Sequence, residues 1–257
     1  MNIQNRRKFI TTALTGVVAA GASASSLKTF IPGDNTTKAI AFDASVIFNA
    51  QPVSALAEKL FAGKGDLLIA LWGTKQFEYT SMRTLGSRYK NFWAVTQDAL
   101  RYSANELKLP LTEDTKNKLM DAWLTLSVWP DVLPALDKLK QKGIRFSLLS
   151  NATPSMLDAC LRYSGINGYF ERVLSTDSVS TFKPDPAAYQ VCIDTLKLKK
   201  SEILFVAYSG WDAVGAKWFG YPVYWVNRQN TPAEGLDISI DGDSNTLDGL
   251  VEFVNNR

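Results

Sequence analysis

The sequence predicts an α/β fold in which a doubly wound parallel sheet carries helices on both faces and a helical cap is inserted after the first strand. Three features of its 257 residues lead to this prediction. Short apolar runs of the kind found in buried strands alternate with helix-like segments, and one long internal block has helical periodicity only. In addition, 46% of the residues are hydrophobic, which is enough for a large core with a smaller attached domain.

The first strand is expected at residues 39–42, an apolar run that ends directly before Asp43. After it the pattern changes, and from residue 53 to 128 the apolar side chains recur at helical spacing. Within this block, a Thr-Glu-Asp-Thr stretch at 112–115 is typical of the start of a helix. We therefore assign residues 53–128 to the cap, and assign to the α/β core the two segments 37–52 and 129–257.

The second half of the sequence continues as alternating helices and strands. Pro130 is expected to open a helix that runs through Lys142 and ends at Gly143, because glycine is typical of helix C-termini. Ligands of a doubly wound sheet bind beyond the carboxyl ends of its strands, so polar residues that follow the strands are candidates for a site. The remaining strands are predicted at 144–149, 173–174, 203–207 and 223–226.

The first 24 residues have the layout of a cleavable export signal. Two arginines and a lysine at positions 6–8 precede an apolar stretch from Phe9 to Ala22, and an Ala-Ser-Ala sequence at 22–24 fits a cleavage site. The apolar stretch is shorter than the roughly 18 residues that span a bilayer, which favours a twin-arginine-type signal over a membrane anchor or a basic tail. We expect export to a bacterial periplasm, a linker at 25–36, and no membrane span after cleavage.

The composition excludes several functions. Lysine and arginine number 28 against 25 aspartates and glutamates, but positions 6–8 hold three of the basic residues, so the chain after residue 24 is neutral. No basic run with interleaved aromatic residues follows, and nucleic acid is not an expected partner. The sequence contains no histidine and only two cysteines, which excludes Ser-His-Asp and Cys-His catalysis and the usual zinc sites. Base chemistry must therefore come from Asp, Glu, Lys or Tyr.

Four short motifs lie at or just beyond the carboxyl ends of predicted strands, where a parallel sheet would bring them together. They are Ala41-Phe42-Asp43, Leu149-Ser150-Asn151, Phe182-Lys183-Pro184 and Ser209-Gly210-Trp211-Asp212. The combination suits displacement by a carboxylate: Asp43 can form an ester, Lys183 keeps it ionised and Asp212 supports the later hydrolysis. Each motif also has a plainer interpretation, as a helix cap, a polar turn or a solvated lysine.

In this order the motifs resemble the haloacid dehalogenase superfamily, and within it the type II (S)-2-haloacid dehalogenases. The resemblance covers roughly residues 38–228 and includes cap stretches such as Leu71-Trp72, Glu78-Tyr79-Thr80 and Phe92-Trp93. It implies a Rossmann-like core and a small 2-haloacid or related carboxylate as substrate. It also implies a homodimer formed through the cap, which no surface pattern in the sequence indicates.

By this resemblance, Asp43 attacks the carbon that bears the halogen, displaces halide with inversion, and forms an ester that water cleaves. Ser150 and Asn151 would hold the substrate carboxylate and the departing halide. Lys183 would pair with Asp43 and with Asp212, and Asp212 would position Lys183 or the hydrolytic water. Substrate contacts are further expected from Trp72, Phe92, Tyr189 and Ser209, although Phe92 and Tyr189 also fit helix residues packed in a core.

The sequence departs from the family pattern near these motifs. The family has Asp-x-Tyr-Gly-Thr at the nucleophile, where this sequence has Ser45 and Ile47 in place of tyrosine and threonine. The arginine that receives the halide falls on Gly73, which removes a charge-assisted donor worth about 1.5 to 3 kcal/mol. The serine and asparagine that hold the hydrolytic water fall on Ala207 and Ser209. The residues for nucleophilic attack therefore match the family pattern better than the residues for halide departure and ester hydrolysis do.

Three functions stay open on the sequence alone: a dehalogenase, a catalytically silent exported relative that binds a small carboxylate or a partner, and an ester- or phosphate-directed hydrolase. Magnesium-dependent phosphatase chemistry is disfavoured, because Ser45 and Tyr208 stand where it needs acids. No metal or other cofactor is expected. Cys160 and Cys192 are expected to be buried in helices, and a disulfide between them is disfavoured but open.

Overall fold

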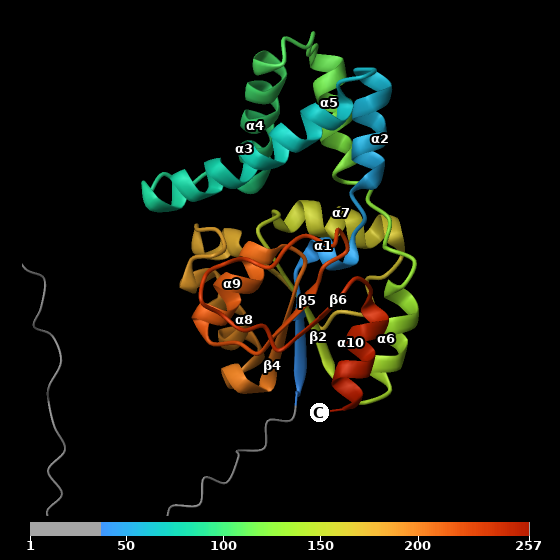
Figure 1. Cartoon of the computed structure of the whole chain (residues 1–257), viewed down its shortest axis with the longest axis vertical. Helices are drawn as coiled ribbons and strands as arrows, with labels where there is room; N and C mark the ends of the chain where they lie inside the picture. Colours follow the sequence, from blue (N-terminus) through green and yellow to red (C-terminus); the bar gives the residue numbers. More distant parts are fainter. Residues whose placement is uncertain (1–36, 257) are drawn as a thin grey trace, which may run out of the picture. The chain divides into compact units, whose positions relative to one another are not determined.

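The computed structural model describes residues 37–256, which contain one six-stranded sheet in the order β3-β2-β1-β4-β5-β6 (Figure 1). All neighbouring strands are parallel, and β1 lies between β2 and β4. The chain winds outward from β1 to β3 and then returns to β4, which confirms the predicted doubly wound sheet. The strands are β1 Ala39–Phe42, β2 Arg145–Ser150, β3 Arg172–Ser175, β4 Ile203–Ala207, β5 Val223–Val226 and β6 Gly242–Ser244.

Helices cover both faces of the sheet because side chains along each buried strand alternate between two hydrophobic clusters. In β1, Ile40 and Phe42 belong to the cluster shared with α6, α7 and α10, whereas Ala39 and Ala41 belong to the cluster shared with α8 and α9. The core helices are α1 Ala44–Ile47, α6 Val132–Lys140, α7 Pro154–Ser164, α8 Pro186–Leu196, α9 Gly210–Phe219 and α10 Leu247–Asn255, with 3-10 turns η1 Thr176–Val179 and η2 Lys200–Glu202.

The two cysteines lie in helices and are buried, as predicted. Cys160 of α7 and Cys192 of α8 are both free. They belong to the different clusters on opposite faces of the sheet, so the sheet itself stands between them. The disulfide that the sequence left open is therefore absent.

Four helices connect α1 to the rest of the core and lie beyond the carboxyl ends of the strands (Figure 1). Two of them begin at side-chain caps, because Asn91 accepts a hydrogen bond from the N–H of Ala94 and Thr112 accepts one from the N–H of Thr115. All four helices together form the cap. Its boundaries at residues 53 and 128 stay a prediction from the sequence. The cap helices are α2 Gln51–Leu60, α3 Gly65–Leu85, α4 Phe92–Glu106 and α5 Glu113–Ala122.

The sequence analysis did not predict β6 and α10. β6 is a three-residue, partly exposed strand of Gly, Asp and Ser that pairs through its backbone with β5, so it has no apolar run to find. Asp131 fixes this end of the chain, because its carboxylate accepts hydrogen bonds from two guanidinium nitrogens of Arg228 and from the backbone N–H of Leu247.

Within residues 37–256, no helix combines the length and the apolar character that a bilayer crossing requires. The export signal predicted at 1–24 and the linker predicted at 25–36 lie outside the described residues.

Two helical glycines offer a matched test of the packing around the sheet. A Cβ on Gly215 of α9 would lie 2.5 Å from both the Cβ of Pro184 and the hydroxyl oxygen of Tyr189, whereas a Cβ on Gly73 of α3 would meet no atom within 4 Å. Gly215→Ala is therefore expected to lower the free energy of unfolding by about 1–3 kcal/mol through overpacking. Gly73→Ala is expected to raise it by about 0.5–1 kcal/mol through helix propensity. Urea unfolding of both variants measures the difference, and equal changes would contradict this packing.

Candidate active site

Asp43 stands at the carboxyl end of the central strand. It follows β1 directly, and its backbone N–H donates to the carbonyl of Val206 on β4 at 2.9 Å. As the N-cap of α1, it accepts a hydrogen bond on Oδ1 from the N–H of Ser45 at 2.9 Å, while Oδ2 accepts from Nζ of Lys183 at 2.7 Å. The helix-cap interpretation and the predicted pairing with Lys183 are thus both realised, and the carboxylate is held in one orientation.

Lys183 joins three parts of the core. Its side chain is only 2% exposed, and Nζ donates to Asp43 Oδ2 at 2.7 Å, to Asp212 Oδ2 at 2.6 Å and to the carbonyl oxygen of Leu149 at 3.1 Å. An ammonium group has three N–H donors, and all three are used here. The solvated-lysine interpretation is therefore wrong for this residue.

Asp212 lies in the first turn of α9 and is 1% exposed. Its Oδ2 accepts from Lys183, and its Oδ1 accepts from the hydroxyl of Tyr189 at 2.7 Å. The pairing of Lys183 with both acids, which the family resemblance implied, is present in the structure. Tyr189 therefore fixes the Asp212 oxygen that does not contact Lys183.

Burial and neighbouring charges together raise the pKa values of Asp212, Lys183 and Tyr189. Burial raises the pKa of Asp212; the Lys183 ammonium opposes the shift and the charge of Asp43 adds to it, which brings the pKa to about 6. Burial alone would lower the pKa of Lys183, but the charges of Asp212 and Asp43 outweigh it and the pKa is raised. Burial and then the charge of Asp212 raise the pKa of Tyr189 well above its usual value. The raised pKa keeps Lys183 charged at neutral pH.

The loop after β2 provides Ser150 and Asn151. Oδ1 of Asn151 accepts hydrogen bonds from the backbone N–H of Lys183 at 2.9 Å and from the hydroxyl of Thr176 at 3.2 Å, which turns the amide NH₂ group away from that backbone. Oγ of Ser150 accepts from the N–H of Ala152 at 3.1 Å, as in a polar turn. Ser150 therefore forms a polar turn and also lies on the same cavity wall as Asp43 and Lys183.

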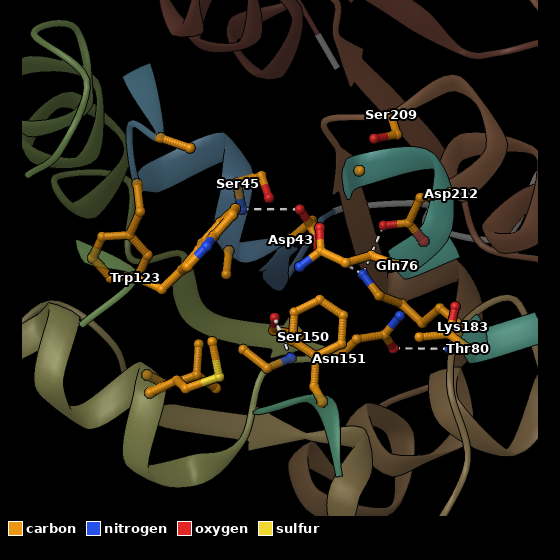
Figure 2. Close-up of a pocket in the computed structure, with 18 of the residues that line it drawn as sticks. Asp43, Ser45, Gln76, Thr80, Trp123, Ser150, Asn151, Lys183, Ser209 and Asp212 are labelled. Carbon is orange, nitrogen blue, oxygen red and sulfur yellow. Dashed lines mark hydrogen bonds and ion pairs between the residues drawn. The ribbon is translucent and has the colours of Figure 1, made fainter. Parts of the chain in front are cut away.

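A cavity of about 230 Å³ lies between the cap and the carboxyl edge of the sheet. Figure 2 shows Asp43 near its centre, with Lys183 and Asp212 on one side and Trp123 on the other. The indole N–H of Trp123 is buried and has no hydrogen-bond partner within residues 37–256. The wall combines the polar cluster with mostly apolar side chains, which include Phe48, Phe77, Phe92, Trp123, Leu126, Met156, Leu157 and Trp211.

Most of the predicted site residues line this cavity, but two do not. Those that line it are Asp43, Ser150, Asn151, Lys183, Asp212, Phe92 and Ser209. The expected substrate contacts of Trp72 and Tyr189 are corrected by the structure, because both residues lie behind the wall. Trp72 is 1% exposed, donates Nε1–H to the carbonyl of Thr96 at 2.8 Å and packs edge-on against Trp123. Tyr189 is fully buried and directs its hydroxyl at Asp212.

Sequence reasoning missed the part of the wall that α3 provides. Gly73, Gln76, Phe77 and Thr80 all line the cavity and stand at i, i+3, i+4 and i+7, the spacing of one helix face. Since Gly73 was singled out from the sequence, this spacing was the signal that would have identified the other three residues.

The far end of the cap touches the segment that leads to Lys183. The hydroxyl of Tyr89, in the loop between α3 and α4, donates to Asp177 of η1. The Tyr89 ring packs against Phe182 with the ring centres 5.1 Å apart. Thr84 and Thr181 add a hydroxyl contact at 3.5 Å. Residue 183 thus follows directly on a stretch held by the cap.

No group of three or more His, Cys, Asp or Glu side chains within residues 37–256 is arranged to hold a metal ion. The described site is instead a buried carboxylate, lysine and carboxylate cluster at the switch point of a doubly wound sheet, beneath a helical cap. The fold and this cluster together indicate a hydrolase, a class in which a carboxylate of this kind can serve as the nucleophile.

Comparison with known proteins places the chain within this class. The sequence model of the haloacid dehalogenase-like hydrolases matches residues 29–220, and the chain belongs to that family. The (S)-2-haloacid dehalogenase of Pseudomonas sp. (strain YL) is 38% identical over 217 residues, which are 84% of this chain and 94% of the relative. The haloacetate dehalogenase H-2 of Moraxella sp. (strain B) is 35% identical over 218 residues, 84% of this chain and 97% of the relative.

A similar solved structure is that of the L-2-haloacid dehalogenase from Xanthobacter autotrophicus with chloropropionic acid covalently bound. It superimposes with a TM-score of 0.78 at 30% sequence identity, and the match covers 85% of this chain and 98% of that chain.

Removal of the Lys183 charge tests the electrostatics of the cluster. Lys183→Met leaves the buried carboxylate of Asp212 and the partly buried carboxylate of Asp43 without their cation and is expected to lower the free energy of unfolding by about 3–5 kcal/mol at pH 8. The loss should be smaller at pH 5. Asp212 has a folded pKa above its unfolded value, so its protonated form favours the folded state at low pH, and that contribution is lost as pH rises through about 6. Urea unfolding at both pH values measures this, and an equal loss at pH 5 and pH 8 would contradict it.

Proposed function

We propose that this protein is a hydrolase of the (S)-2-haloacid dehalogenase type, which displaces halide from a small 2-haloalkanoic acid through an ester on Asp43. The observation that supports this proposal most directly is the position of Asp43 on the cavity wall. Its carboxylate is oriented by the Ser45 N–H at 2.9 Å and by Lys183 Nζ at 2.7 Å. The dehalogenase names of relatives that are similar over most of the chain support the same reaction.

In the first step, a carboxylate oxygen of Asp43 forms a bond to the substrate carbon, and the carbon–halogen bond breaks with its electron pair on the halide. The Lys183 ammonium donates to that carboxylate and orients it for attack. In the second step, water cleaves the ester. Asp212 fixes Lys183 and provides an acceptor on the wall for this water, since each of its oxygens has a further lone pair.

Substrate binding is assigned to the loop after β2 and to the apolar wall. The hydroxyl of Ser150 and the amide NH₂ of Asn151 are the neutral donors for the substrate carboxyl and the halide. Phe92 and the other apolar residues surround the carbon chain. The two hydrogen bonds to Asn151 Oδ1 fix this residue before substrate arrives, which lowers the entropy lost on binding.

The departures from the family pattern favour a second candidate, a catalytically silent relative that binds a small carboxylate or a partner in the same cavity. Gly73 supplies no donor to the wall. Ile47 and Ala207 are fully buried and apolar, so neither replaces the hydroxyl expected in the family. Ser209 is present on the wall, but its side chain makes no helix-capping hydrogen bond. An ester- or phosphate-directed hydrolase has less support, because Ser45 cannot act as the second acid.

We further propose that the chain is exported, that the signal at 1–24 is removed, and that the mature protein forms a homodimer. The paired arginines, the apolar stretch and the Ala-Ser-Ala sequence support export. The family resemblance supports the homodimer. N-terminal sequencing of the protein from the periplasm, together with light scattering of the mature form, tests both proposals.

Free halide and intact protein mass, followed together, test the proposed reaction. The mature protein incubated with (S)-2-chloropropionate or bromoacetate is expected to release halide continuously, whereas Asp43→Asn should release none above the blank because it lacks the attacking carboxylate. An adduct on the wild type without turnover would place the defect in ester hydrolysis. Absence of both halide and adduct would contradict the dehalogenase and favour the binding protein.

The titration of Asp212 should appear in the rate. We expect kcat/KM for halide release to rise as pH increases through about 6 and then level off, because the ionised carboxylate forms an ion pair with Lys183 and accepts a stronger hydrogen bond from water than the neutral acid does. Asp212→Asn has no titrating group at this position. It should lack the inflection and be at least about a hundredfold slower. The same inflection in this variant would assign the titration to another group.

A further inference from the structure

The charges on the cavity wall do not complement an anionic substrate. Within residues 37–256, the charged side chains that line the cavity are Asp43, Asp212 and Lys183. The ammonium of Lys183 is occupied by the two carboxylates and by the carbonyl of Leu149, so no N–H of this cation is left for a ligand. With both acids ionised, the wall carries one excess negative charge.

A substrate carboxylate that enters this cavity therefore meets like charge. At separations of about 5 Å, and with an effective dielectric constant between those of water and a protein surface, such repulsion weakens binding roughly fourfold to a few hundredfold. An uncharged carboxamide of the same size and shape does not experience it.

The neutral groups on the wall suit a carboxamide. The Ser150 hydroxyl and the Asn151 amide can donate to a carbonyl oxygen, whereas the Ala152 N–H is already bound to Ser150 Oγ. Gln76 donates its amide N–H to Thr96 Oγ1 at 3.0 Å and keeps its carbonyl oxygen as an acceptor. An amide NH₂ can donate to such an acceptor or to a carboxylate, but a substrate carboxylate has no proton to donate.

We propose that this site also dehalogenates uncharged 2-haloamides, and that it does so with a higher kcat/KM than for 2-haloacids of equal size. The inference rests on the proposed displacement by Asp43. An Asp43 oxygen forms a bond to the carbon bearing the halogen, and the halide leaves with the electron pair of the broken bond. Water then cleaves the ester, which releases the 2-hydroxyamide and one proton and restores the carboxylate.

Gly73 provides the place at which the charge of the wall can be changed. It lies on α3, lines the cavity, and a Cβ added to it meets no atom within 4 Å. Gly73→Arg adds a cation to the wall. Gly73→Gln adds a side chain of similar length and polarity without the charge, and serves as the matched control.

The experiment compares (S)-2-chloropropionamide with (S)-2-chloropropionate at pH 8 and constant ionic strength. Free chloride and the 2-hydroxy product are measured for wild type, Gly73→Arg and Gly73→Gln, with Asp43→Asn as the blank. Wild type is expected to favour the amide by roughly tenfold or more in kcat/KM, mainly through KM. Gly73→Arg should move this ratio toward the acid by roughly tenfold or more, and Gly73→Gln should leave it near the wild-type value.

Three results would overturn the inference, and they differ in whether the proposed dehalogenase reaction is also contradicted. A wild type that favours the acid, or equal shifts in Gly73→Arg and Gly73→Gln, would remove the charge argument but leave the proposed dehalogenase intact, because the acid is still turned over. Absence of Asp43-dependent chloride from both substrates would remove the proposed reaction and this inference with it.

Discussion

One buried ammonium group holds the candidate site together. Lys183 binds a carboxylate that follows β1, a carbonyl at the end of β2 and a carboxylate at the start of the helix after β4, so three segments far apart in sequence meet at one nitrogen. Such a charge is stable in the interior only when every donor is used and the partners are themselves fixed. The surrounding contacts meet this requirement: Asn151 accepts from the Lys183 backbone, and Tyr189 fixes Asp212.

The same constraint links the fold to the chemistry. A parallel sheet is needed to bring Asp43, Leu149 and Asp212 to one edge, where the ring centre of Phe205 on β4 lies 5.1 Å from the ammonium. The saturation of Lys183 that stabilises the site also leaves the cavity wall formed by residues 37–256 without a free cation. A reaction that begins with attack by Asp43 is therefore well supported by this geometry, whereas the reception of negative charge on the leaving group depends on neutral donors alone.

The sequence was sufficient for β1 to β5 and for the two acids of the charged cluster, because these follow from local patterns. Those five strands contain apolar runs, and Asp43 and Asp212 lie just beyond two of them. The sequence could not distinguish the wall of the cavity from the layer behind it, since Trp72 and Phe92 have the same helical periodicity and only packing decides which of them faces the cavity. Nor could it reveal the excess charge, which depends on the three hydrogen bonds of Lys183. β6 was not predicted because it pairs with β5 through the backbone of three small or polar residues, which leave no apolar pattern in the sequence.

The contacts of Tyr89 with Asp177 and Phe182 join two parts of the chain that are far apart in sequence, the cap and the segment before Lys183. The far end of the cap is attached to the stretch that ends at Lys183. If that end moves away from the sheet, it must either break the hydrogen bond to Asp177 or pull on the residue beside the ammonium. The cap and the segment that leads to Lys183 are in this way joined by direct contacts. Tyr89 thereby helps to hold the residue that precedes Lys183, although it does not line the cavity itself.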